Sequence, residues 1–104
     1  MEDNRLIAEF MGLTNHHDDS SIMVAKTPQG NEVVPIDSLK YHASWDWLMP
    51  VVQKIESLGY VFTIQGGKAE YSEMISKPKI FIAKSKMSST YKAVVQFIKE
   101  YKTI

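Results

Sequence analysis

The stretch that decides the fold is YVFTIQGGKAEYSEMI, residues 60–75. Its first six residues alternate between two sets of side chains, one of them wholly aromatic or aliphatic, which is the period of a β-strand. Gly66 and Gly67 then provide the glycine pair that a tight hairpin turn favours. Apolar and polar side chains alternate again from Lys68, which predicts a second, half-exposed strand to about Ile75. The stretch therefore predicts a β-hairpin.

A third strand is predicted directly after this hairpin. Pro78 ends the second strand, and residues 79–84 alternate isoleucines with Phe81 and Ala83. One face of the predicted sheet is already apolar, and Val61, Phe81 and Ala83 add apolar side chains to the opposite face. We therefore expect both faces of the sheet to be covered.

Helices are predicted at both ends of the chain. The first spans about Glu2 to Met11, where apolar residues recur at helical spacing, and Gly12 suits a left-handed exit from it. The last is predicted to begin at Ser88 or Ser89, because serine is a good N-cap, and to end near Lys102. Its apolar face consists of Tyr91, Val94, Val95, Phe97, Ile98 and Tyr101.

A second hairpin is predicted nearer the N-terminus, after a loop at residues 14–21. The apolar run at 22–25 and the pair at 33–34 enclose a proline–glycine turn signal at 28–31. Pro35 follows the second strand, which makes that strand a candidate for the edge of a sheet.

The helix between the two hairpins contains a proline. Ser44 can cap a helix that runs from Trp45 to Gly59, yet Pro50 lies within it. Because an internal proline removes a backbone hydrogen bond, two interpretations are open. One is a kinked helix from Trp45, which the apolar stripe favours; the other is a tight turn over residues 44–49 with Pro50 near the helix start. The stripe comprises Leu48, Val51, Val52, Ile55 and Leu58.

The order of these elements, α-β-β-α-β-β-β-α, predicts an α+β fold. We expect a mostly antiparallel sheet between two helical layers, that is, a three-layer α/β/α sandwich. Residues 1–104 are expected to form a single domain, since no repeat, low-complexity tract or linker-like composition interrupts them.

Composition excludes several classes of protein. The 104 residues include no cysteine, so disulfides, thiolate nucleophiles, zinc fingers and iron–sulfur clusters are excluded. Twelve basic residues balance twelve acidic ones, which gives no overall charge for binding nucleic acid or membranes. We see neither a membrane-length apolar run nor a signal peptide, and therefore expect a cytoplasmic protein.

Three segments resemble those of a known family. LIAEFMG at residues 6–12, SWDWLMPVVQKI at 44–55 and TYKAVVQFIK at 90–99 are similar to motifs of the phage ABA sandwich domain family, small proteins of phages and prophages. The resemblance implies a sheet between two helical layers and, for a phage-encoded chain, the cytoplasm of a bacterial host. It implies no reaction and no catalytic residues.

The only cluster of metal-binding residue types is His16-His17-Asp18-Asp19. Imidazole and carboxylate groups suit zinc, nickel or manganese. Adjacent side chains point apart, however, so another ligand such as His42 would have to converge on the same ion. A solvated loop explains the cluster better, and we expect neither a metal nor a cofactor.

His42, Ser44 and Asp46 include the residue types of a hydrolase triad. They lie too close in sequence for the usual geometry, and no nucleophile-elbow pattern surrounds Ser44. Helix capping explains Ser44 better, and we expect a protein without enzymatic activity.

The interaction candidates are Trp45, Trp47 and Tyr41. On a helix the two tryptophans point about 200° apart, so they do not both enter one core stripe. Trp45 is expected to pack inward. Trp47 is either covered by the segment around Tyr41, which is favoured because large aromatics are usually buried, or exposed as a recognition residue.

Charge is unevenly distributed along the chain. Residues 1–37 contain seven acidic and two basic side chains, and residues 38–104 contain five acidic and ten basic ones. Lys84, Lys86 and Tyr91 are candidates for holding a phosphate and stacking a base. Lysines around one strand also suit nucleic acid, but the region contains no arginine and protection of a sheet edge explains them better. The set comprises Lys77, Lys79, Lys84 and Lys86.

Two functions follow from these features. The first is a phage-type accessory protein that binds a host protein, a phage protein or a second copy of itself. The alternative is a module that binds and sequesters a small ligand or nucleotide, as in counter-defence, with nucleic-acid binding less favoured.

Overall fold

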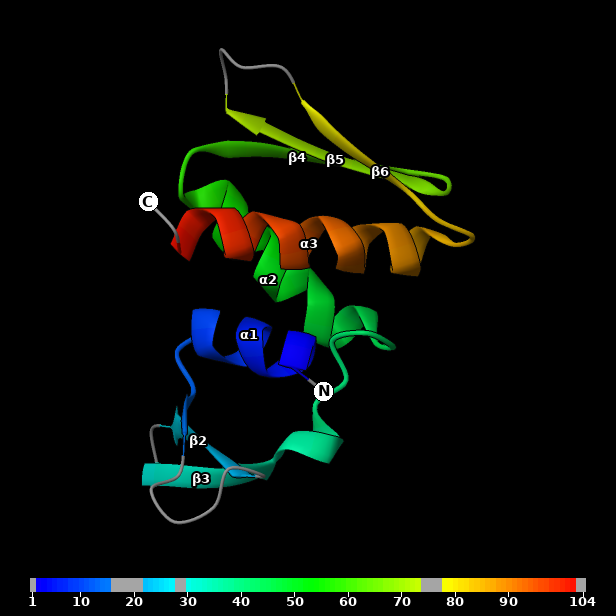
Figure 1. Cartoon of the computed structure of the whole chain (residues 1–104). Coiled ribbons are helices and arrows are strands. Elements are labelled where there is room, and N and C mark those ends of the chain that lie inside the picture. Colours follow the sequence, from blue (N-terminus) through cyan, green and yellow to red (C-terminus); the bar gives the residue numbers. More distant parts are fainter. Residues whose placement is uncertain (1, 16–21, 28–29, 74–77, 103–104) are drawn as a thin grey trace. The chain divides into compact units, whose positions relative to one another are not determined.

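The computed structural model describes residues 2–15, 22–27, 30–73 and 78–102. Within these residues the chain forms three α-helices and two three-stranded antiparallel sheets (Figure 1). The α+β class, the antiparallel pairing and the predicted order of helices and hairpins are confirmed. The strands belong to two sheets, however, where the sequence predicted one. The chain divides into two compact units, Met1–Lys40 and Tyr41–Ile104.

The first unit contains α1 (Glu2–Phe10), β1 (Thr14–Asn15), β2 (Ile22–Thr27), β3 (Gly30–Pro35) and the 3₁₀ turn η1 (Ile36–Ser38). Its sheet has the order β1-β2-β3, which confirms the predicted hairpin and its edge strand. The expected loop was wrong at its start, because the two residues of β1 pair with β2.

Two contacts fix the ends of α1. Gly12 takes a φ of +98°, which confirms the left-handed exit, and the Leu13 N–H donates to the Ala8 carbonyl over 2.9 Å. The Asn4 amide, buried on the helix, donates to the Leu39 carbonyl over 3.2 Å. The hydrogen bond satisfies an amide that would otherwise be costly to bury.

The second unit contains α2 (Trp45–Ser57), β4 (Tyr60–Gln65), β5 (Lys68–Glu73), β6 (Lys79–Ile82) and α3 (Lys86–Lys102). The sheet has the order β4-β5-β6, so β5 is central. Helix α3 packs against all three strands and α2 packs against β4 and α3, and both helices lie on one side of the sheet (Figure 1). The core of this unit is therefore between the helices and one sheet face.

Helix α2 starts at Trp45 and includes Pro50, so the interpretation as one helix is confirmed and the tight turn is wrong. Ser44 occupies the N-cap position, but its side chain makes no capping hydrogen bond, which corrects its expected role. Gly59 follows the helix with a φ of +97°, a conformation that favours glycine.

Helix α3 begins at Lys86, earlier than predicted. Ser85 is the residue that caps it: the Ser88 N–H donates to the Ser85 Oγ over 3.1 Å, and the Ser89 N–H donates to the Ser85 carbonyl over 3.0 Å. Ser88 and Ser89 therefore lie inside the helix, where Ser89 is buried and its hydroxyl donates to the Lys86 carbonyl.

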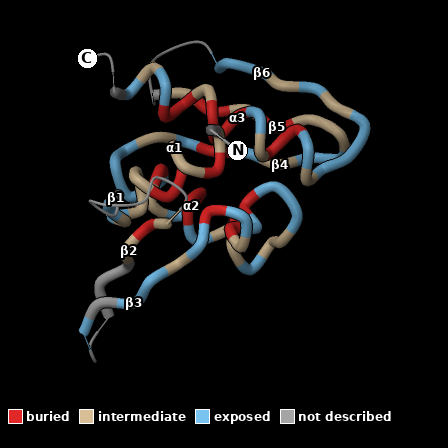
Figure 2. The backbone as a smooth tube through the Cα atoms, turned by 60° about the horizontal axis from the view of Figure 1, so that its bottom comes forward, coloured by how far each residue is buried: buried red, intermediate tan, exposed pale blue. Residues whose placement is uncertain are grey.

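The two faces of the β4-β5-β6 sheet differ in burial. Phe81 is the register partner of the buried Ala69, so it faces the helices, and alternation turns Ile80 and Ile82 outward. The expected burial of Val61 is wrong, since it is 50% exposed on this outer face. In Figure 2 the strand β6 is intermediate or exposed throughout, whereas β4, β5 and the two helices contain buried positions.

Candidate interaction surface

Trp47, in the first turn of α2, packs against the segment before the helix. Tyr41 is buried, and its ring meets Trp47 edge to face with centroids 5.2 Å apart and planes at 88°. Burial also raises the pKa of the Tyr41 hydroxyl. Trp45 and Trp47 are both half-buried. This geometry corresponds to the covered tryptophan that the sequence favoured.

The residue types of a hydrolase triad lie in the segment before α2 and in the first turn of the helix. His42 and Asp46 are exposed, and Ser44 occupies the N-cap position before α2. The His42 ring instead meets Tyr91 edge to face at 6.3 Å and 77°. These contacts give His42 and Tyr91 a role in packing.

The cluster of metal-binding residue types, His16, His17, Asp18 and Asp19, for which a solvated loop was the favoured explanation, lies outside the described residues. In the described part of the chain, no three histidine, aspartate or glutamate side chains gather in a way that could hold a metal ion. No helix of the described residues is long and apolar enough to span a membrane.

The candidate ligand residues flank the start of α3. Lys84 and Lys86 are exposed, and Tyr91 is half-buried against His42. Lys86 and Tyr91 are five positions apart in the helix, so their side chains point about 140° apart. This separation does not favour a shared phosphate and base site.

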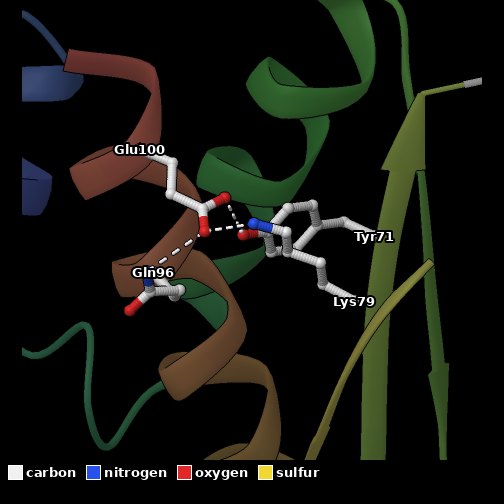
Figure 3. A network of polar contacts seen from close by, with 4 residues as sticks. All are labelled: Tyr71, Lys79, Gln96 and Glu100. Atoms are coloured by element: carbon white, nitrogen blue, oxygen red, sulfur yellow. Dashed lines mark hydrogen bonds and ion pairs between the residues drawn. The ribbon is translucent and has the colours of Figure 1, made fainter. Parts of the chain in front are cut away.

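A polar network joins β5 and β6 to the last turns of α3 (Figure 3). Tyr71 donates its hydroxyl proton to Glu100 Oε2 over 2.9 Å, and Gln96 Nε2 donates to Glu100 Oε1 over 3.3 Å. Lys79 forms an ion pair with the same carboxylate. One acidic side chain thus connects two strands to the helix.

The network holds its groups in their ordinary protonation states. The hydrogen bond from Lys79 is the main cause that lowers the Glu100 pKa, so the carboxylate stays charged. Burial and then the bond to Glu100 raise the Tyr71 pKa, so the phenol stays protonated. A neutral phenol that donates to a carboxylate suits a structural link and not a nucleophile.

Aromatic rings pack around Tyr71 and Phe97. Phe97 is 2% exposed and meets Tyr60 and Tyr71 edge to face, with ring centroids 4.7 and 5.3 Å away. Tyr71 also stacks between Phe62 and Phe81, at 6.3 and 5.8 Å with near-parallel planes. A row of stacked rings therefore crosses the sheet from β4 to β6.

The outer face at β6 presents apolar side chains to solvent. Ile80 is 51% exposed and Ile82 is 74% exposed, and their register partners on β5 are Glu70 and Lys68. We call the two isoleucines and the open side of their strand the β6 edge. The sequence placed these residues in a strand but did not identify this surface, because the alternation of Ile80 and Ile82 with Phe81 left the exposed face undecided.

Comparisons with protein families, with curated protein sequences and with solved structures find no match to this chain.

Proposed function

We propose that the chain is a non-enzymatic protein-binding module that acts through the β6 edge. The exposure of Ile80 and Ile82 is the observation that carries the proposal. Single exposed apolar residues are common, but two adjacent ones on the same face of an edge strand form a site that a second polypeptide can cover. Such a partner gains both apolar burial and backbone hydrogen bonds.

The remaining candidate groups support a binding role more than a reaction. The rings of Tyr41 and Trp47 pack against one another, and Glu100 connects Tyr71 to Lys79. The resemblance to phage ABA sandwich proteins supports an accessory role in phage biology, with a host protein, a phage protein or the chain itself as partner.

A site-specific photo-cross-linker tests the proposal. Benzoylphenylalanine replaces Ile82 on the β6 edge or, as a matched control, the exposed Lys92 on α3. After irradiation of cells that produce the chain, we expect a cross-linked protein product from position 82 and little from position 92. Equal or absent cross-linking at the two positions would contradict protein binding through this edge.

A further inference from the structure

The backbone of β6 presents its unused hydrogen-bonding groups at Ile80 and Ile82. In an antiparallel ladder, alternate residues direct both their N–H and their C=O to the neighbouring strand. The Ala83 N–H donates to the Gly67 carbonyl over 3.0 Å, which directs Ala83 toward the β5 side. The register Ala69↔Phe81 continues this ladder, so Phe81 is also directed to β5 and the groups of Ile80 and Ile82 face the open edge.

The same two residues carry the exposed apolar side chains. Edge strands are commonly protected by lysine and proline; here Lys79 is the first residue of the strand, and Pro78 and Lys84 flank it. Between them, Ile80 and Ile82 leave an apolar segment whose backbone is open to pairing. The flanks thus limit pairing to a short segment.

We propose that two copies of the chain pair through this segment, antiparallel, about a two-fold axis at Phe81. The inference rests on the proposed protein binding at the β6 edge and names its partner. Ile80 of each copy then lies opposite Ile82 of the other, and the outward N–H and C=O groups of both residues are all satisfied. The two exposed isoleucines of each copy form one apolar cluster on the outer face.

Other symmetric registers satisfy fewer groups within the strand. An axis at Ile80 places Ile82 opposite Pro78, which has no N–H. An axis at Ile82 places Ile80 opposite Lys84, which lies beyond the end of β6. The axis at Phe81 is the register in which both outward residues, Ile80 and Ile82, pair with residues of the other copy's strand.

The row of stacked rings favours a second copy over an unrelated peptide. Phe62, Tyr71 and Phe81 stack across the sheet, and the row ends at Phe81, where it reaches the edge. At the proposed axis each Phe81 lies beside that of the second copy, so the row continues into the other sheet. A six-stranded sheet with an uninterrupted aromatic row results.

The lysines at the flanks are compatible with this arrangement. Lys79 forms an ion pair with Glu100 of its own chain on the inner face. Lys84 of the two copies are separated by about six residues along the paired strands, or about 20 Å, which exceeds the distance over which surface charges interact in physiological salt. Because the paired segment is short, we expect a weak, concentration-dependent dimer.

Sedimentation equilibrium of the full chain tests the pairing. The wild type is expected to shift from its 11.9 kDa monomer toward twice that mass as its concentration rises. Ile82→Pro removes an outward N–H but no bond to β5, and should weaken dimerisation at least tenfold. Val61→Lys, at a position on the opposite edge strand whose side chain is 50% exposed, should leave it unchanged.

Cysteine pairs test the register, since the chain contains no cysteine of its own. A mixture of Ile80→Cys and Ile82→Cys chains should form disulfide dimers several times faster than either variant alone, because the proposed axis brings those two positions together. A wild type that stays monomeric, or cysteine variants that cross-link equally well alone, would overturn the proposal. A monomer that still cross-links another protein from position 82 overturns self-pairing and leaves the proposed function standing.

Discussion

The aromatic centre of the second unit leads to a quantitative prediction for Phe97→Ala. The side chain is 2% exposed and its ring contacts those of Tyr60, Tyr71 and Tyr101. Removing a buried phenylalanine ring typically costs about 3–5 kcal/mol, because apolar burial is lost and a cavity remains. Small domains have only about 5–15 kcal/mol of stability in total, so we expect this change to remove a large part of it.

Urea unfolding measures the effect, with Trp45 and Trp47 in α2 as fluorescence reporters and circular dichroism as a second probe. A loss of about 4 kcal/mol corresponds to a fall in Tm of roughly 15–30 °C.

Tyr101→Ala is the matched control. Tyr101 stacks on Phe97 at 5.6 Å but is 40% exposed, so its loss should cost less than about 1.5 kcal/mol. If Phe97→Ala is no more destabilising than Tyr101→Ala, Phe97 is not the centre of this packing.

Three further predictions concern single contacts. The lowered Glu100 pKa gives stability that is present above the ordinary value of 4.5 and is lost as the pH falls through the lower folded value. Glu100→Gln should therefore reduce the acid sensitivity that pH-dependent unfolding measures. The expected change is less than about 1 kcal/mol, because the Glu100 side chain is partly exposed. Gly67→Ala places a Cβ 2.7 Å from the Ala83 carbonyl oxygen and should cost about 1–3 kcal/mol, with faster hydrogen exchange at the Ala83 amide. Ser85→Ala should cost about 1 kcal/mol in urea unfolding, whereas Ser44→Ala should cost less than about 0.5 kcal/mol because its side chain makes no capping bond.

Periodicity and turn residues were sufficient to predict most elements. Gly66 in the turn between β4 and β5 and the glycines after α1 and α2 mark real ends of elements, because few other residues tolerate their positive φ angles. Pro50 did not break α2, since apolar packing of the helix outweighs one missing hydrogen bond. Ser85 was missed as a cap because three serines near the start of α3 offer the same local signal.

Which face of a strand is buried was harder to predict. Ile80 and Phe81 are both apolar, so alternation in β6 fits either orientation equally well. Register with Ala69 and Tyr71 decides the orientation, and register is set by pairing between strands that a local pattern does not describe. The network at Glu100 was likewise invisible in the sequence, since Tyr71 and Glu100 are 29 residues apart.

The network at Glu100 explains how a four-residue strand can present an ordered edge, the one at which we propose binding. Short edge strands fray readily, because only one neighbour supplies hydrogen bonds. In β6, the side chains that alternate inward, Lys79 and Phe81, bind Glu100 and stack on Tyr71, so both are attached to the body of the unit. Ile80 and Ile82 are thereby held in place while their backbone N–H and C=O groups stay directed to the open edge. The alternation of side chains thus both anchors β6 through its inner face and leaves its outer edge open.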